Sequence, residues 1–357
     1  MNTWGQKLKL SIFGESHGPG IGLVVDGLPS GEDICLEKLQ TEMARRAPGS
    51  SPLTTGRREK DEVQIFSGLM DGRTTGAPVC GLIMNSDAKS GDYNRLLRPG
   101  HADWSAWLKY QGRADLRGGG HFSGRLTAPL VFAGALAKQI LVRHGISVHG
   151  RISALGGIAD SQDVPVRPEI RQTIAAKAWP VFDEAAGEMM KASILAAKED
   201  GDSVGGIIEA AAFGLPGGLG EPFFGSAESV ISSIMFSIPG IKGVEFGEGF
   251  GFANLRGSEA NDQLAVSDGV VTALSNHNGG ILGGISNGQP LVVRVAVKPT
   301  PSIARDQRSV DPVSKKETAL RIQGRHDPSI VPRAVVVVEA AVALSILELA
   351  LTAGKIQ

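Results

Sequence analysis

Residues 334–353 limit the possible folds of this chain more than any other segment, because they are almost continuously apolar. A stretch of that length either crosses a membrane or is buried on all sides in a protein core. Two carboxylates, Glu339 and Glu348, interrupt it, and an acidic group at the centre of a bilayer costs about 2.5–3.5 kcal/mol. We therefore expect a buried strand-to-helix segment in a globular core, and no membrane partner.

The rest of the chain alternates between apolar segments and glycine-rich turns, which predicts an α+β protein. Apolar, β-branched runs predict strands at residues 21–28, 62–66, 77–84, 205–213, 243–246 and 290–298. Helical spacing predicts helices at residues 36–47, 126–144 and 227–237, and an alanine-rich helix at 168–198 that is broken near Pro180. The charged stretches 49–62 and 305–321 lack an apolar period, so we expect exposed loops there.

A Gly-Leu-Pro turn occurs twice, beginning at Gly27 and at Gly214, each time after a predicted strand and before a predicted helix. A Pro-Gly pair follows each of those helices, at Pro48 and at Pro239. One interpretation is an internal duplication, with halves at about residues 5–150 and 200–350 inside a single domain that spans the whole chain. The alternative is that such turns recur by chance.

Net charge and cysteine content exclude several classes of protein. The formal net charge is −1, which argues against nucleic acid or an anionic membrane as a bulk electrostatic partner. Cys35 and Cys80 lie beside apolar residues without metal-ligand spacing, so we expect reduced, buried thiols in a reducing compartment. Because the N-terminus lacks the apolar core of a signal peptide, we expect a cytoplasmic protein.

Five of the seven histidines lie in short glycine-rich loops, mostly beside arginine, serine or a carboxylate. They are His17, His101, His121, His277 and His326. Histidine changes charge near neutral pH, arginine grips phosphate or carboxylate with two parallel hydrogen bonds, and glycine lets backbone N–H groups approach a ligand. Together these residues predict a site that binds an anion and moves protons. The alternative for each loop is a surface turn that carries a histidine.

Three of these loops suggest specific roles. Residues 14–18 fit the G-x-S-x-G pattern of hydrolases, but a strand is expected after them where that motif needs a helix, so we exclude it. Asp103 can orient or charge-stabilise His101. Three glycines before His121 precede a predicted helix, where free N–H groups suit a phosphate; a flexible hinge is the alternative. The histidines are scattered, without H-x-H or H-E-x-x-H, so we expect no catalytic metal.

Taken together, the motifs closely resemble those of chorismate synthases. The first is Gly14-Glu15-Ser16-His17-Gly18, followed by an apolar strand and Asp26-Gly27-Leu28-Pro29. The second is Arg98-Pro99-Gly100-His101-Ala102-Asp103, and the third is Gly324-Arg325-His326-Asp327-Pro328. The resemblance covers nearly the whole chain, from Trp4 to the region of Leu349.

The resemblance implies a lyase that converts 5-enolpyruvylshikimate 3-phosphate to chorismate and phosphate, the last common step toward the aromatic amino acids. This 1,4-elimination involves no net redox change, yet the family requires reduced FMN. In the family's mechanism the reduced flavin transiently gives an electron to the substrate, phosphate leaves, and the remaining hydrogen goes to flavin N5. The substrate carries a phosphate and two carboxylates, which suits an arginine-lined site.

The resemblance also implies roles for individual residues. His101 would protonate or stabilise the reduced flavin, and His17 would give a proton to the departing phosphate. Asp327, helped by Ser16 and Ser123, would assist proton removal at flavin N5. The substrate-binding arginines would be Arg45, Arg46, Arg98 and Arg125. The flavin-binding positions would be His121, Phe122, Ser123, Pro239, Gly240, Gly283, Lys298, Pro299, Thr300, Pro301, Ser302 and Arg325.

Two departures from the family pattern affect the cofactors. Many members carry Arg-Ser-Ser-Ala-Arg after the triple glycine, where this chain has His121-Phe122-Ser123-Gly124-Arg125, so the flavin contact at position 121 changes type. Arg46 matches a position implied for NADP, but Pro52 stands where many members have an arginine for nicotinamide or substrate. No flavin-reductase segment is visible, so we expect NADPH to act only indirectly, with an external reductant supplying the reduced flavin.

The family fold is a β-α-β sandwich, with helices packed between antiparallel sheets, assembled as a homotetramer. This fold agrees with the duplication hypothesis. Two other function classes stay open. A flavin-dependent oxidoreductase with net redox chemistry would be separated from an elimination by counting turnovers per reducing equivalent. A nucleotide- or RNA-binding protein is disfavoured by the near-neutral charge and the few aromatic residues.

Overall fold

Two five-stranded antiparallel sheets flank a layer of helices in a computed structural model that describes residues 2–49, 53, 59–86, 96–161, 164–267, 269–322 and 326–356. The first sheet comprises, in order, β1 (Thr3–Trp4), β2 (Lys9–Gly14), β3 (Gly20–Asp26), β7 (Val79–Met84) and β4 (Gln64–Ser67). The second comprises β11 (Ile241–Phe246), β16 (Leu291–Val297), β10 (Gly206–Phe213), β8 (Ser147–Leu155) and β9 (Ile158–Ala159). Four short pairs complete the described strands: β5 (Leu69–Met70) with β6 (Arg73–Thr74), β12 (Leu264–Ser267) with β13 (Val270–Ala273), β14 (Ile281–Leu282) with β15 (Ile285–Ser286), and β17 (Gln307–Asp311) with β18 (Lys316–Leu320).

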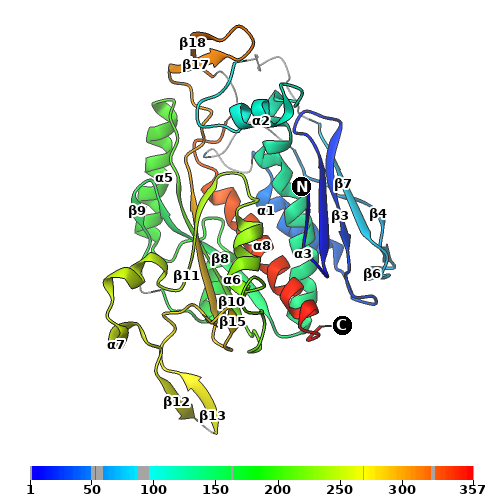
Figure 1. Cartoon of the computed structure of the whole chain (residues 1–357), viewed down its shortest axis with the longest axis vertical. Coiled ribbons are helices and arrows are strands. Elements are labelled where there is room, and N and C mark those ends of the chain that lie inside the picture. The colour runs from blue at the N-terminus through cyan, green and yellow to red at the C-terminus, as the bar shows by residue number, and fades with distance from the viewer. Residues whose placement is uncertain are drawn as a thin grey trace.

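The helices between the sheets form the core. The described α-helices are α1 (Leu36–Arg46), α2 (Asp103–Tyr110), α3 (Thr127–Arg143), α4 (Pro168–Ala175), α5 (Glu184–Glu199), α6 (Ala227–Met235), α7 (Gly257–Ala260) and α8 (Val331–Thr352). The described 3-10 turns are η2 (Arg117–Phe122), η3 (Gly124–Leu126) and η4 (Gly249–Asn254). Helix α3 packs on β3 and β7, α8 packs on β8 and β10, and the two helices pack on each other (Figure 1). Each sheet therefore buries one face against its own helix.

The C-terminal apolar segment is one continuous helix, α8, so the predicted strand in its first part is wrong. The valine run 335–338 has strand propensity, but packing on all sides decides its conformation. Residues 117–143 and α8 are each long and apolar enough to span a membrane, yet 83% and 94% of their most apolar windows lie buried inside this fold. Both segments are thus core helices of the structure.

The two carboxylates of α8 are buried because each has full polar compensation. Glu348 accepts hydrogen bonds from the backbone N–H groups of the turn before β2, with that of Leu8 at 2.6 Å. Glu339 binds both terminal nitrogens of Arg45, at 2.7 and 2.9 Å, the Nζ of Lys138, and the N–H of Gly150 at 2.8 Å. Burial raises the pKa of Glu339, but Lys138 and Arg45 outweigh it and lower that pKa to about 2.

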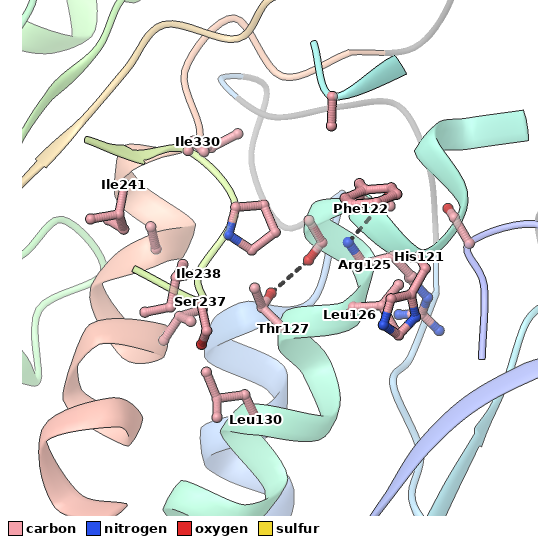
Figure 2. Close-up of a pocket in the computed structure, with 18 of the residues that line it drawn as sticks. His121, Phe122, Arg125, Leu126, Thr127, Leu130, Ser237, Ile238, Ile241 and Ile330 are labelled. Carbon is pink, nitrogen blue, oxygen red and sulfur yellow. Dashed lines mark hydrogen bonds between the residues drawn. The ribbon is translucent and has the colours of Figure 1, made fainter. Parts of the chain in front are cut away.

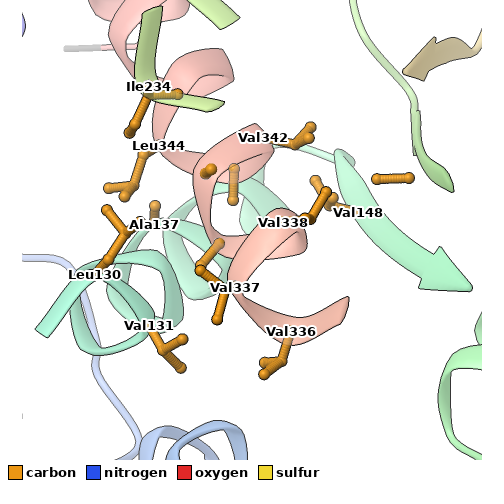
Figure 3. Close-up of a cluster of buried hydrophobic side chains, with 14 of the residues drawn as sticks. Leu130, Val131, Ala137, Val148, Ile234, Val336, Val337, Val338, Val342 and Leu344 are labelled. Atoms are coloured by element: carbon orange, nitrogen blue, oxygen red, sulfur yellow. The ribbon is translucent and has the colours of Figure 1, made fainter. Parts of the chain in front are cut away.

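Helices α3 and α8 meet so closely that their crossing point requires glycine. A Cβ on Gly134 would lie 2.2 Å from the Cβ of Ala340, which is far inside van der Waals contact. Around this point aliphatic side chains from both helices interdigitate with Val148 of β8 and Ile234 of α6 (Figure 3). The small residues set the spacing of the two helices, and the aliphatic side chains fill the remaining space.

We expect Gly134→Ala to lower the free energy of unfolding by about 1–3 kcal/mol, because the added methyl overpacks the α3–α8 contact. Chemical denaturation at neutral pH measures this loss. Gly257→Ala is the control, since Gly257 begins α7 with no heavy atom within 4 Å of the new Cβ. An unchanged midpoint for Gly134→Ala would show that the helices can separate at little cost.

The two sheets share one connectivity. Strands β2, β3, β7 and β4 of the first sheet follow the same order as β8, β10, β16 and β11 of the second. The first residue of each Gly-Leu-Pro turn has to be glycine for the same reason, because its φ is positive and a backbone carbonyl oxygen occupies the place of a Cβ. Gly27 (φ 89°) would place a Cβ 2.0 Å from the carbonyl oxygen of Lys7, and Gly214 (φ 76°) would place one 2.1 Å from that of Gly145. Each turn is followed by a helix, α1 in one case and α6 in the other.

Most other predicted elements are confirmed, with small shifts at their ends. The predicted break near Pro180 is confirmed: α4 ends at Ala175 and α5 begins at Glu184. Asp183 caps α5 by accepting a hydrogen bond from the N–H of Ala185 at 2.8 Å. Residues 305–321, predicted as a loop, contain the β17–β18 hairpin instead.

The prediction of buried thiols is wrong for Cys35, which is exposed at the start of α1, and Cys80 is only half-buried. Most of the predicted loop 49–62 lies outside the described residues.

Candidate functional site

A cavity of about 880 Å³ lies beside the N-terminal ends of α3 and α8. Residues of η2, η3 and α3 form one wall, and residues 236–242 after α6 form the facing wall (Figure 2). Residues 298–302 and 326–337 also line it. It brings together these predicted site residues: Ser16, Arg46, Arg98, His101, His121, Phe122, Ser123, Arg125, Pro239, Gly240, Lys298, Pro299, Thr300, Pro301, Ser302 and Asp327.

Four predicted site residues are not among the lining residues. Arg45 binds Glu339 in the core, and Gly283 lies in the exposed turn between β14 and β15. Arg325 lies outside the described residues. His17 is close to the cavity, because its imidazole lies against Gly118, which does line it.

Because Gly118, Gly119 and Gly120 have no side chains, the imidazole rings of two histidines pack directly against their backbone. Gly118, Gly119 and Gly120 have φ values of 59°, 87° and 52°, which L-residues with side chains rarely adopt. A Cβ on Gly118 would lie 2.5 Å from Nε2 of His17, and one on Gly119 would lie 3.3 Å from Nε2 of His101. The glycines precede α3, as predicted, but η3 lies between them and the N-terminus of that helix, where the phosphate cradle was expected.

His101 is held by a carboxylate on the next element. Its Nδ1 lies 2.7 Å from Oδ1 of Asp103, the first residue of α2. Burial raises the pKa of Asp103, but hydrogen bonds from Arg98 and His101 outweigh it and hold the pKa well below its ordinary value. The predicted pairing of Asp103 with His101 is therefore present.

A buried cluster of charges lies behind the cavity wall. Arg46 donates to Asp61 Oδ2 at 2.8 Å and to the carbonyl oxygen of Gly124 at 2.8 Å. Arg125 pairs with the other oxygen of Asp61 and, at 2.6 Å, with Glu59. Burial lowers the pKa of both arginines, and the two guanidiniums keep the pKa of Asp61 below its ordinary value although burial opposes this. Both guanidiniums therefore stand in fixed positions.

Residues 298–302 are tied to the loops around them. The N–H of Lys298 donates to the carbonyl oxygen of Gly240 at 2.9 Å, and its Nζ donates to that of Gly100. The hydroxyl of Ser203 donates to the carbonyl oxygen of Thr300 at 2.7 Å. The Oγ1 of Thr300 is buried and has no hydrogen-bond partner among the described residues.

The comparisons with known proteins agree with this geometry. Residues 8–351 match the profile of the family described as chorismate synthase. The chain is 47% identical over 358 residues to the chorismate synthase of Dehalococcoides mccartyi strain BAV1, covering 99% of this chain and 98% of the relative. It is 47% identical over 345 residues to that of Thermococcus kodakarensis, covering 96% and 95%.

A solved structure is similar over the same length. A crystal structure of chorismate synthase superimposes with a TM-score of 0.78 at 30% identity, covering 98% of this chain and 93% of the other. The chain belongs to the chorismate synthase family. It is an enzyme, a lyase that converts 5-enolpyruvylshikimate 3-phosphate to chorismate and phosphate in aromatic amino acid biosynthesis. Chorismate synthases use reduced flavin.

The chorismate synthase cavity also contains cations that the sequence did not single out as site residues. Arg333 and Lys242 line it, and Arg333 donates to Asp327 at 2.6 Å and to the carbonyl oxygen of Arg46 at 3.0 Å. An arginine in the first turn of a helix opposes the helix dipole, and this was the available signal for Arg333. His326, which the sequence indicated only as an organiser of its loop, also lines the cavity.

No group of three metal-ligating side chains occurs within the part of the chain that the structure describes.

Proposed function

We propose that the cavity binds 5-enolpyruvylshikimate 3-phosphate together with reduced FMN, and that His17, His101 and Asp327 move the protons of the elimination. The balance of charge on the cavity wall carries this proposal. Six cationic side chains line it: Arg46, Arg98, Arg125, Lys242, Lys298 and Arg333. Asp327 is the single carboxylate among the described lining residues. The carboxylates that pair with Arg46, Arg98 and Arg125 are Asp61, Asp103 and Glu59, and they do not line the cavity. Such a wall suits a ligand with a phosphate and two carboxylates.

The lining residues also fit a flavin mononucleotide. Thr300 offers a buried hydroxyl with no described partner, and Lys298 and Lys242 offer positive charge to a phosphate. Burial, with a smaller effect from Lys242, lowers the pKa of Lys298. We propose that residues 298–302, Pro239, Gly240 and the segment His121 to Ser123 hold the cofactor. When bound, reduced FMN supplies an electron transiently and recovers it within each turnover.

The protein's own groups provide acid, base and orientation. We assign His17 as the proton donor to the departing phosphate, since a general acid with a pKa near working pH is most effective. We assign His101 to protonate or stabilise the reduced cofactor, with Nε2 as the working nitrogen. Asp327, oriented by Arg333, assists the removal of the remaining proton, with the help of Ser16 and Ser123. Arg46 and Arg125 bind the substrate's anionic groups.

An anaerobic assay with photoreduced FMN tests this function. We expect many molecules of chorismate and phosphate per reducing equivalent, because an elimination consumes no electrons in net. One product per reducing equivalent would instead favour the flavin-dependent oxidoreductase. If no phosphate is released from the substrate, the proposed function is wrong.

We expect Gly118→Ala to lower kcat about 10- to 100-fold, because the new methyl group displaces the His17 imidazole by roughly an ångström. Steady-state kinetics measure this, and circular dichroism checks the fold. The control is Gly354→Ala, which imposes a similar φ (65° at Gly354, 59° at Gly118) but has no heavy atom within 4 Å of the new Cβ. Equal loss of activity in both variants would attribute the effect to backbone strain alone.

We further propose one domain built as a sandwich from two related halves, since both sheets have the same strand order and the same glycine turns. Assembly into a homotetramer is supported by the β12–β13 arm, which projects from the body (Figure 1) and exposes Leu264, Val266, Val270 and Val271.

We also propose a cytoplasmic enzyme that receives reduced flavin from an external reductant, with NADPH acting only indirectly.

A further inference from the structure

We propose that Asp103 is a positioning residue that fixes which nitrogen of His101 carries the proton, and that Arg98 holds Asp103 rather than the substrate. The inference rests on the proposed function only for the catalytic role of His101. It differs from the sequence-based expectation, in which Arg98 was one of the substrate-binding arginines.

Arg98 and Asp103 form a closed, two-point contact. Arg98 donates from Nε to Oδ2 at 2.7 Å and from Nη2 to Oδ1 at 2.8 Å, and its backbone N–H donates to Oδ2 at 3.1 Å. Both residues are buried, with 7% and 3% of their surfaces exposed. A planar guanidinium matches a carboxylate in this way and fixes its orientation. The position of Asp103 at the start of α2 adds favourable interaction with the helix dipole.

The orientation of Asp103 determines the tautomer of His101. Nδ1 of His101 lies 2.7 Å from Oδ1 of Asp103, and at that distance one of the two atoms must carry a proton. Oδ1 already accepts from Arg98 Nη2, so the carboxylate stays an acceptor and the proton belongs on Nδ1. Nη2 of Arg98 also lies 3.2 Å from Nδ1, and it would become the donor to Nδ1 if the carboxylate were absent.

Fixing the proton on Nδ1 makes Nε2 the nitrogen that exchanges protons in the cavity. Nε2 lies against Gly119. His101 and Gly118, the residue before Gly119, both line the cavity. Gly119 itself places no side chain over this edge of the ring. The carboxylate, the imidazole and the glycine therefore act together to present one defined proton site.

A further contact of Arg98 reaches residues 298–302 at the wall of the cavity, which Arg98 also lines. Its Nη1 lies 3.5 Å from the hydroxyl of Ser302. Two of its three nitrogens are thus committed to Asp103, and the third is beside Ser302. We therefore expect a substitution of Arg98 to act on kcat through His101 and to leave KM for the substrate nearly unchanged.

Nitrogen-15 NMR of the imidazoles in the free, wild-type protein tests the tautomer directly. At a pH where His101 is neutral we expect the proton on Nδ1, with the signal assigned by its loss in His101→Ala. In Asp103→Ala we expect the proton to move to Nε2, because Arg98 then donates to Nδ1. A neutral wild-type His101 with its proton on Nε2 would overturn the proposal, whether or not Asp103→Ala folds.

Steady-state kinetics test the role of Arg98. We expect Asp103→Ala to lower kcat about 100-fold or more, and Arg98→Lys to lower kcat at least about 10-fold while KM for the substrate stays within about twofold. Asp33→Asn, at an exposed ion pair with Arg73, should change neither constant. A rise in KM without a fall in kcat for Arg98→Lys would show that Arg98 binds the substrate and would overturn this part of the proposal.

The NMR measurement does not depend on catalysis. Its result stands even if no chorismate is formed, so failure of the proposed function is distinguishable from failure of this inference.

Discussion

Alanine at His17 or at His101 is expected to lower kcat about 100-fold or more while the protein stays folded. Each imidazole lies at the edge of the cavity against one glycine of the same run, and neither belongs to the buried apolar core. Removing either ring takes away a proton carrier without opening a large void in that core. Turnover under anaerobic conditions and the denaturation midpoint of each variant measure the two effects separately.

The matched control for both substitutions is His144→Ala. His144 is exposed at the C-terminal end of α3, at the far end of that helix from the cavity. We expect its loss to leave turnover unchanged. If His17→Ala or His101→Ala unfolds the protein instead of inactivating it, the histidine in question is structural, and the proton-transfer assignment is wrong.

The second large effect concerns stability. Glu339→Ala is expected to lower the free energy of unfolding by about 3–5 kcal/mol, because it removes the buried one of the two carboxylates, Glu339 and Glu42, that Arg45 and Lys138 share. Arg45 and Lys138 both bind this carboxylate, which is 1% exposed. Urea unfolding at pH 7 measures the loss. The control is Glu188→Ala, which removes an exposed carboxylate paired with Lys191 on α5 and is expected to cost less than about 0.5 kcal/mol.

The pH dependence of this contribution has a definite sign. The pKa of Glu339 is lowered from its ordinary 4.5 to about 2 in the folded protein, so the unfolded chain binds a proton first as the pH falls. Its contribution is therefore complete above pH 4.5 and is lost as the pH falls toward 2. We expect Glu339→Gln, if it folds, to flatten the acid limb of the stability curve. An unchanged acid limb would contradict the assignment of that pKa.

The sequence predicted the elements whose local pattern agrees with their tertiary environment. The helix at α3, the strands β3 and β10, and the break before α5 all carry their own signals: apolar period, β-branched runs, and a proline followed by a capping Asp183. The valine run of α8 misled the prediction because local propensity favours a strand there, and only burial between two sheets makes it helical. The β17–β18 hairpin was missed since its exposed strands carry almost no apolar alternation.

The site was predicted in the same uneven way. The histidines in glycine loops indicated His101 and Ser16, and both line the cavity, but sequence cannot tell which arginines face a cavity. Arg45 and Arg46 are neighbours on α1, and helical geometry sends Arg46 toward Asp61 and Arg45 toward Glu339. Glu59 and Asp61, which hold Arg125, lie in a charged stretch that reads as a solvated loop. Their importance becomes visible only when residues distant in sequence are brought together.

The last helix of the chain is also the element on which both sheets depend. Helix α8 packs on β8 and β10 and on α3, and Glu348 binds the turn that leads into β2. A nascent chain that ends before Val331 thus carries the strands of both sheets but lacks the helix that joins their layers. On the ribosome, the faces of β8, β10 and α3 that α8 covers have no partner until α8 emerges. We expect the core to close only after α8 has been synthesised, which makes a growing chain that still lacks α8 a natural client for chaperones.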